Sequence, residues 1–239
     1  MTAHVFVYTM TNDSCFAPSI TENYLTLACC KGAVVSGYSM RHQAWKKFSE
    51  AKTSKGDSVW VIGVAGKDLI KKGKDLIKKG ESLESFWCHP VYIAKITECV
   101  RIKKYYDRSN PGTKRFSAQK DWNSYKYISG KFESQKDVNE HHGDAEAIEK
   151  DTLKGSHVLV SGKENFHYFG RSLFDNFIFP KNFLDKITDP FRNGSRGNRR
   201  PLEFINDDLY KILENYSDNG WRNQGIDEKY DAYKKRVGL

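Results

Sequence analysis

The segment VWVIGVA, residues 59–65, carries the strongest indication of fold in this sequence. It follows a turn at Lys55-Gly56-Asp57, and a short apolar run bounded by a turn is typical of a buried strand. Residues 4–9, HVFVYT, have a similar composition and predict another buried strand near the N-terminus. The core is therefore expected to contain a β-sheet.

Further segments have the residue spacing of strands or helices. Good helix formers fill residues 41–52, with Ala44, Trp45 and Phe48 on one face. The expected strands are YLTLACCK at residues 24–31, VYIAKITECVRI at 91–102, and two short segments at 158–161 and 166–169 joined by a turn at Gly162. The spacing is helical again over residues 181–216, notably at Leu209, Ile212 and Leu213.

These elements predict an α+β fold, in which a curved, mostly antiparallel sheet or a small β-barrel has helices at its periphery. With 239 residues and 27.5 kDa, the chain has room for one large domain or two small ones. We expect a core over residues 1–180, with basic inserts at 67–80 and 101–131. A helical extension over residues 181–239 is expected to pack on that core.

The charge balance favours an anionic partner. Lys and Arg total 39 against 30 Asp and Glu, which gives a net charge of +9 and a pI near 9.1. Such a surplus attracts nucleic acid, nucleotides or an anionic membrane surface, although many basic proteins bind none of them. An aromatic content of 13% argues against disorder. No apolar run approaches the roughly 18 residues that a transmembrane helix needs, so we expect no membrane partner.

Cysteine usage and the first ten residues predict a cytoplasmic location. The number of cysteines is odd, and their spacing matches neither a disulfide framework nor a CxxC zinc pair. Residues 1–10 have neither the basic region nor the apolar run of a secretory signal. A reducing cytoplasm fits both observations. The cysteines are Cys15, Cys29, Cys30, Cys88 and Cys99.

Basic and aromatic residues are interleaved over residues 101–131, which contain nine basic residues, two acids and six aromatics. The stretch is a candidate surface for base stacking and phosphate contacts, unless the acidic residues of 132–151 neutralise it. The loop RNGSRGNRR, residues 192–200, adds arginines suited to phosphate binding or simply to a solvated loop. The candidate nucleic-acid-binding residues are Lys103, Lys104, Arg108, Arg115, Trp122, Tyr125, Arg196, Arg199 and Arg200.

The heptapeptide KDLIKKG occupies residues 67–73 and is repeated at 74–80. Surface loops tolerate insertions, so a duplication without function is one interpretation. The other is a basic flap near a phosphate-bearing ligand.

Two predicted strand ends carry reactive side chains. Asp13 and Ser14 follow the first strand, where they either bond to their own backbone or present a carboxylate and a hydroxyl to a ligand. Cys29 lies near Lys31, whose charge would lower the thiol pKa, although free cysteines are more often buried apolar residues. A nucleophilic cysteine needs a base, and a histidine of the pair His141-His142 is the candidate acid or base.

The motifs of several familiar classes of enzyme are missing from the sequence. The sequence has no Walker loop, no GxGxxG and no GxSxG, which argues against P-loop NTPases, Rossmann dehydrogenases and α/β-hydrolases. Glu140, His141, His142 and Asp144 lack a matched second half, so a metal site is not expected. No cofactor is indicated, and the residues leave open whether the protein is catalytic.

The order and spacing of several short motifs resemble the nucleotide-modification-associated domains of microbes and phages, over about residues 4–170. The resemblance implies a role in making or handling modified DNA bases, and it supplies no mechanism. The matching motifs are DSCFAP at 13–18, LACCK at 27–31, GD at 56–57 before VWVIG at 59–63, HH at 141–142, DT at 151–152, VLVS at 158–161 and FHYFG at 166–170.

A second likeness is to the PUA-like barrels that read modified bases. It rests on Gly56-Asp57 entering a strand, a strand near residues 91–100, and Tyr105-Tyr106-Asp107. Three functions therefore stay open: an enzyme of base modification, a non-catalytic PUA-like reader of modified nucleic acid, and an interaction protein of a phage or antiphage defence system.

Overall fold

Two parallel strands form the centre of the larger sheet, β1 (Thr2–Met10) and β4 (Ser58–Ala65). Every residue of β4 is buried. Because a parallel pair is covered on both faces, its sequence is a continuous apolar run, which explains VWVIGVA and confirms both strand predictions. The computed structural model describes residues 1–10, 18–20, 24–28, 39–54, 56–72, 87–105, 125–134, 148–169, 179–191 and 201–217.

The larger sheet has the strand order β10-β5-β4-β1-β11 and is antiparallel everywhere except between β1 and β4. A smaller antiparallel sheet has the order β2-β3-β9-β6, and β7 and β8 form a hairpin. The strands not yet bounded are β2 (Ser19–Ile20), β3 (Tyr24–Leu27), β5 (Pro90–Lys95), β6 (Glu98–Arg101), β7 (Tyr125–Ile128), β8 (Lys131–Ser134), β9 (His157–Gly162), β10 (Phe166–Tyr168) and β11 (Leu202–Ile205).

The single strand expected over residues 91–102 is two strands that belong to different sheets. The chain leaves the larger sheet at Ile96, whose N–H donates to Val59, and joins the smaller sheet at Thr97, whose N–H donates to Val160. The chain also passes from the smaller sheet to the larger one between β9 and β10. A 3₁₀ turn at Lys163–Asn165 makes this connection. The predicted turn at Gly162 therefore connects two sheets and is not a hairpin.

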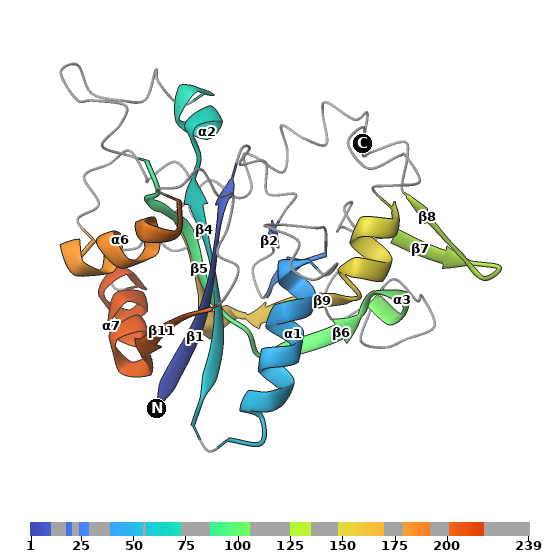
Figure 1. Ribbon diagram of the computed structural model, residues 1–239, viewed down its shortest axis with the longest axis horizontal. Coiled ribbons are helices and arrows are strands. Elements are labelled where there is room, and N and C mark those ends of the chain that lie inside the picture. The colour runs from blue at the N-terminus through green and yellow to red at the C-terminus, as the bar shows by residue number, and fades with distance from the viewer. Residues whose placement is uncertain are drawn as a thin grey trace.

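Helices cover both faces of the larger sheet (Figure 1). On one face, α1 and the smaller sheet pack against Phe6, Tyr8 and Val61. On the other face, α6 and α7 pack against Val5 and Ile62. The helices are α1 (Met40–Ala51), α2 (Lys67–Lys72), α3 (Ile102–Tyr105), a π-helical turn at Lys150–Lys154, α6 (Lys181–Thr188), a 3₁₀ turn at Asp189–Phe191, and α7 (Asn206–Ser217).

The helix predictions hold in part. α1 matches the expected helix at residues 41–52, and Leu209, Ile212 and Leu213, whose spacing predicted a helix, lie in α7 and are buried. The expectation of helical structure over 181–216 missed β11, which pairs antiparallel with β1. The division of the chain into a core and an extension at residue 180 stays a prediction. The strand β11 comes after this boundary and joins the larger sheet, to which the N-terminal strand β1 also belongs.

The fold class is α+β, as the sequence predicts. The alternative of a small PUA-like barrel does not hold for the described residues, because both sheets are open and end at unclosed edge strands. The first copy of the repeat begins with α2, and Ile70 of this helix is buried in the core. The second copy, residues 74–80, lies outside the described residues.

Candidate functional site

The six predicted catalytic residues stay predictions, because they lie outside the described residues: Asp13, Ser14, Cys29, Lys31, His141 and His142. Among the predicted nucleic-acid-binding residues, Lys103 and Lys104 are exposed on α3. Tyr125 begins β7, and only its backbone is described. The others also fall outside the described ranges: Arg108, Arg115, Trp122, Arg196, Arg199 and Arg200.

Lys103 makes a cation–π contact with the β7–β8 hairpin. Its Nζ lies 4.1 Å from the ring centroid of Tyr127, and Tyr127 meets Phe132 edge to face at 4.9 Å. The hairpin turns at Ser129 and Gly130, which both have positive φ, as the two central residues of a type I′ turn require. Basic and aromatic residues of the 101–131 stretch thus meet in space as well as in sequence.

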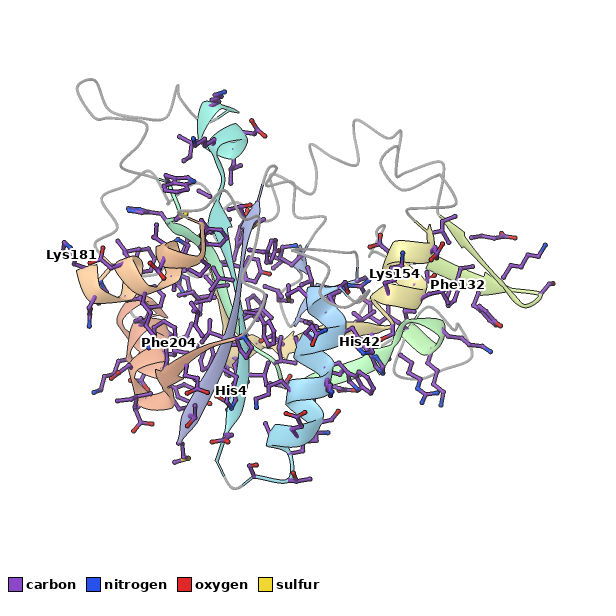
Figure 2. All side chains as sticks on the ribbon, in the orientation of Figure 1. His4, His42, Phe132, Lys154, Lys181 and Phe204 are labelled. Carbon is purple, nitrogen blue, oxygen red and sulfur yellow. The ribbon has the colours of Figure 1, made fainter. Side chains whose placement is uncertain are left out.

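A denser group of polar and aromatic side chains lies where α1 meets the start of β9. The rings of Trp45 and His157 stack in parallel, with centroids 4.0 Å apart and an interplanar angle of 8°. His42, one helical turn before Trp45, meets the indole edge to face at 5.1 Å. Figure 2 shows His42 on the side of the molecule where Lys154 and Phe132 lie, and Lys181 at the other end.

Ser156 connects the two histidines of this group. Its Oγ lies 3.0 Å from Nδ1 of His42 and 2.8 Å from Nδ1 of His157. A hydroxyl has one proton to donate, so one imidazole accepts that proton while the other donates to the same oxygen. The arrangement is a hydrogen-bonded chain of imidazole, hydroxyl and imidazole.

The backbone at Ser156 is strained. Its φ is +54°, in a region that few residues other than glycine adopt. The N–H of His157 donates to the carbonyl of Gly155 at 2.6 Å, which closes a three-residue turn around Ser156. A turn of this length with positive φ at its centre is the rare, strained form of the γ-turn, and such strain concentrates at functional sites.

Arg41 anchors this strained turn from within the protein. It is fully buried, and its guanidinium donates to the backbone carbonyls of His157, at 2.8 Å, and of Asp151. The same guanidinium lies 3.8 Å from the buried carboxylate of Asp151. A Cβ on Gly155 would lie 2.0 Å from Arg41 Nη2, so glycine is required for the guanidinium to fit. The anchored segment includes the π-helical turn, a feature that is frequent at functional sites.

Both histidines of the group are neutral at pH 7. Burial lowers the pKa of His157 to about 4, and the charges of Arg101, of His42 when it is protonated, and of Arg41 contribute to the shift. Burial also lowers the pKa of His42, with a contribution from Lys46. A neutral imidazole accepts a proton, so either ring is in the form that a general base needs.

Exposed positive side chains lie on β6, which pairs with the strand of His157, and on α3, which follows β6. Arg101 faces His157 across the β6–β9 ladder and is exposed. A backbone hydrogen bond joins the start of α3 to the Ser156 turn, because the N–H of Ile102 donates to the carbonyl of Ser156. We call Trp45, His157, Arg101, Lys103 and Lys104 the basic-aromatic surface.

Sequence reasoning missed His42, Ser156 and His157. Trp45 was identified only as part of an apolar helix face. No short segment of the sequence contains all three residues, because His42 and Ser156 are 114 positions apart. A motif search within single segments therefore cannot find the group. Only the neighbouring Asp151-Thr152 and residues 158–161 were noted, as motifs of a family.

Two described cysteines are not candidate nucleophiles. Burial raises the pKa of Cys88 to about 12, although a hydrogen bond with Thr188 opposes the shift. Burial raises the pKa of Cys99 to about 12 as well, with opposing effects of Lys52 and Glu98. Both are therefore thiols rather than thiolates at neutral pH.

No group of three or more His, Cys, Asp or Glu among the described residues is arranged to hold a metal ion. No helix within the described ranges is long and apolar enough to cross a membrane.

The family of the chain follows from a comparison with known protein families. The family described as nucleotide modification associated domain 2 matches residues 2–224, which includes both sheets, the Ser156 turn and α7. The protein therefore belongs to this family, in agreement with the resemblance of its motifs. Neither the curated proteins nor the solved structures contain a match.

Proposed function

We propose that this protein binds a nucleotide or a nucleic acid through the basic-aromatic surface, and that it takes part in making or processing modified DNA bases. The observation that carries the proposal is the stack of Trp45 on His157 with Arg101 beside it. Membership of a nucleotide-modification family supports the same class of ligand.

The surface combines the two components that nucleic-acid binding uses. Aromatic side chains stack on bases, at about 1–3 kcal/mol per base, and Lys or Arg neutralise phosphates. Trp45 remains partly exposed while His157 holds its ring in place, so its orientation is fixed before a ligand arrives. Arg101, Lys103 and Lys104 are all exposed within one continuous segment of β6 and α3.

The first test is binding of a fluorescently labelled single-stranded DNA oligonucleotide, measured by anisotropy over a range of salt concentrations. The double variant Lys103→Ala/Lys104→Ala removes two positive charges from the surface and should weaken binding and lower the salt dependence. The matched control is Lys181→Ala/Lys211→Ala, which removes two exposed lysines from α6 and α7 on the opposite side of the larger sheet. Equal affinity of the two double variants would refute the proposed surface.

The second test concerns a bound nucleotide. Mass spectrometry of small molecules released when the purified protein is denatured should detect a stoichiometric nucleotide if the protein has a preformed pocket. In the enzymatic form of the proposal, Asp13, Ser14, Cys29 and Lys31 line that pocket, and His141 or His142 is the acid or base. Asp13→Ala and Cys29→Ala should then abolish turnover without unfolding the protein.

A reader of modified nucleic acid is the second candidate function. It retains the support of the net charge of +9 and of the basic-aromatic stretch, but not that of a PUA-like barrel. Heterogeneous oligonucleotides released by salt, without turnover of any nucleotide, would favour the reader. Coelution with a protein and no nucleic acid would instead favour an interaction protein of a phage or defence system.

A further inference from the structure

We propose that Ser156 is a nucleophile that attacks electrophilic phosphoryl groups, with His42 as its general base. The proposal concerns a reaction at the α1–β9 junction, and it holds whether or not the basic-aromatic surface binds nucleic acid. It uses none of the residues that the sequence identified as catalytic.

Geometry supports this role for the hydroxyl. A serine nucleophile needs a base within hydrogen-bonding distance and a third group that orients the pair. Ser156 Oγ has an imidazole nitrogen on each side, at 3.0 Å for His42 and 2.8 Å for His157. We assign His42 Nδ1 as the acceptor of the hydroxyl proton and His157 Nδ1–H as the donor to the oxygen, because His42 is the more exposed ring and passes the proton on to water.

The surroundings fix each of the three groups. His157 is held by its stack on Trp45 and by the bond from Arg41 to its carbonyl. His42 lies on the first turn of α1, where its ring contacts the edge of Trp45. The γ-turn places Ser156 at a tight bend, and the Ser156 residue is only partly buried.

Charge favours a phosphoryl group as the electrophile. Arg101 lies across the ladder from His157, which follows Ser156 in the chain, and its positive charge acts on the His157 imidazole. Positive side chains near the reacting atom stabilise the negative charge on phosphoryl oxygens in the transition state.

The reaction has two steps. Ser156 Oγ forms a bond to phosphorus while its proton passes to His42 Nδ1, and the bond between phosphorus and the leaving group breaks with the electron pair going to the leaving group. After His42 has released that proton to solvent, water attacks phosphorus and gives one proton to His42 Nδ1. The bond between phosphorus and Oγ breaks with its electron pair going to Oγ, and His42 passes its proton to Oγ. The net reaction is hydrolysis of the phosphoryl compound.

The experiment treats the full-length protein with diisopropyl fluorophosphate and identifies the adduct by intact mass and peptide mapping. Here fluoride is the leaving group, so the adduct reports the first step alone. We expect a single adduct on Ser156, and a rate at least 100-fold lower in His42→Ala, as loss of a general base typically causes. Absence of an adduct, an adduct on another residue, or an unchanged rate in His42→Ala would overturn the proposal.

Two variants provide the controls. Ser54→Ala removes an exposed serine just after α1 and should label at the wild-type rate. Ser156→Gly removes the hydroxyl but accepts positive φ readily, so it should fold and remain unlabelled. Anisotropy with the DNA oligonucleotide is measured on the same samples. Wild-type protein that stays unlabelled but still binds DNA refutes the nucleophile and leaves the proposed function intact. Protein that is labelled on Ser156 but does not bind DNA refutes the proposed function and leaves the nucleophile intact.

Discussion

The guanidinium of Arg41 donates a hydrogen bond to the backbone carbonyl of His157, 2.8 Å away, although 116 residues separate the two in sequence. This bond fixes the start of β9 to the first turn of α1. The Trp45–His157 stack and the Ser156 contacts lie around it, so the candidate site depends on an interaction within the core.

Replacing Gly155 by alanine should destabilise the protein by about 1–3 kcal/mol, the usual cost of forcing atoms into a packed site. The new Cβ would lie 2.0 Å from Arg41 Nη2 and 2.4 Å from the carbonyl oxygen of Asp151. The measurement is the free energy of unfolding from urea denaturation. Gly162→Ala is the control, because a Cβ there meets no atom within 4 Å, and it should cost far less. Equal losses in the two variants would contradict the steric explanation.

Arg41→Met should cost about 3–5 kcal/mol, because it breaks a buried ion pair by removing the guanidinium that lies 3.8 Å from the carboxylate of Asp151. The double variant Arg41→Met/Asp151→Leu removes the buried carboxylate as well and should recover part of the loss. Lys181→Met serves as the comparison, since Lys181 forms an exposed ion pair with Asp185 and such pairs contribute about 0–1 kcal/mol. Thermal or urea unfolding of the set would test the difference, and a small effect of Arg41→Met would argue against a structural role of the buried pair.

The stability of the protein should fall as the pH is lowered from about 6.5 toward 4. His157 titrates near 6.5 when the chain is unfolded and at about 4 when folded, because burial and the charges of Arg101, His42 and Arg41 oppose its protonation. Between these values the unfolded chain binds a proton that the folded protein excludes, so the contribution is present above the unfolded pKa and is lost on acidification. His157→Phe keeps a ring against Trp45 but does not titrate, so its stability should change less over this range. Parallel pH profiles of the two proteins would contradict the assignment.

Thiol reactivity distinguishes the predicted Cys29 from the two described cysteines. Burial raises the pKa of Cys88 and of Cys99 to about 12, so neither should react with iodoacetamide at pH 8 in the folded state. If Lys31 lowers the pKa of Cys29, that thiol should be alkylated first. Peptide mapping after timed alkylation measures the order, and Lys31→Met should slow Cys29 alone. Alkylation of Cys29 no faster than that of Cys99 would count against its role as a nucleophile.

Local patterns were sufficient for the central strands and for α1. Residues 59–65 form an apolar run, and residues 4–9 contain no Asp, Glu, Lys or Arg. Such segments fit strands that are buried on both faces of a sheet. The apolar face of α1 repeats at helical spacing and therefore needs no knowledge of its partner. The family too was recognisable from short motifs, and its match covers residues 2–224.

Tertiary structure decided the features that depend on partners. Residues 202–205 form a strand because β1 offers an unpaired edge, a reason that lies outside the segment itself. The 91–102 segment divides at Ile96 and Thr97 because each residue bonds to a different sheet. His42 meets Ser156 and His157 only through the packing of α1 on β9. A sequence pattern indicates how one segment is buried, and this made the strands predictable. Contacts between residues more than 100 positions apart in the sequence arise from the tertiary fold. The Ser156 site depends on such contacts and was therefore not predictable.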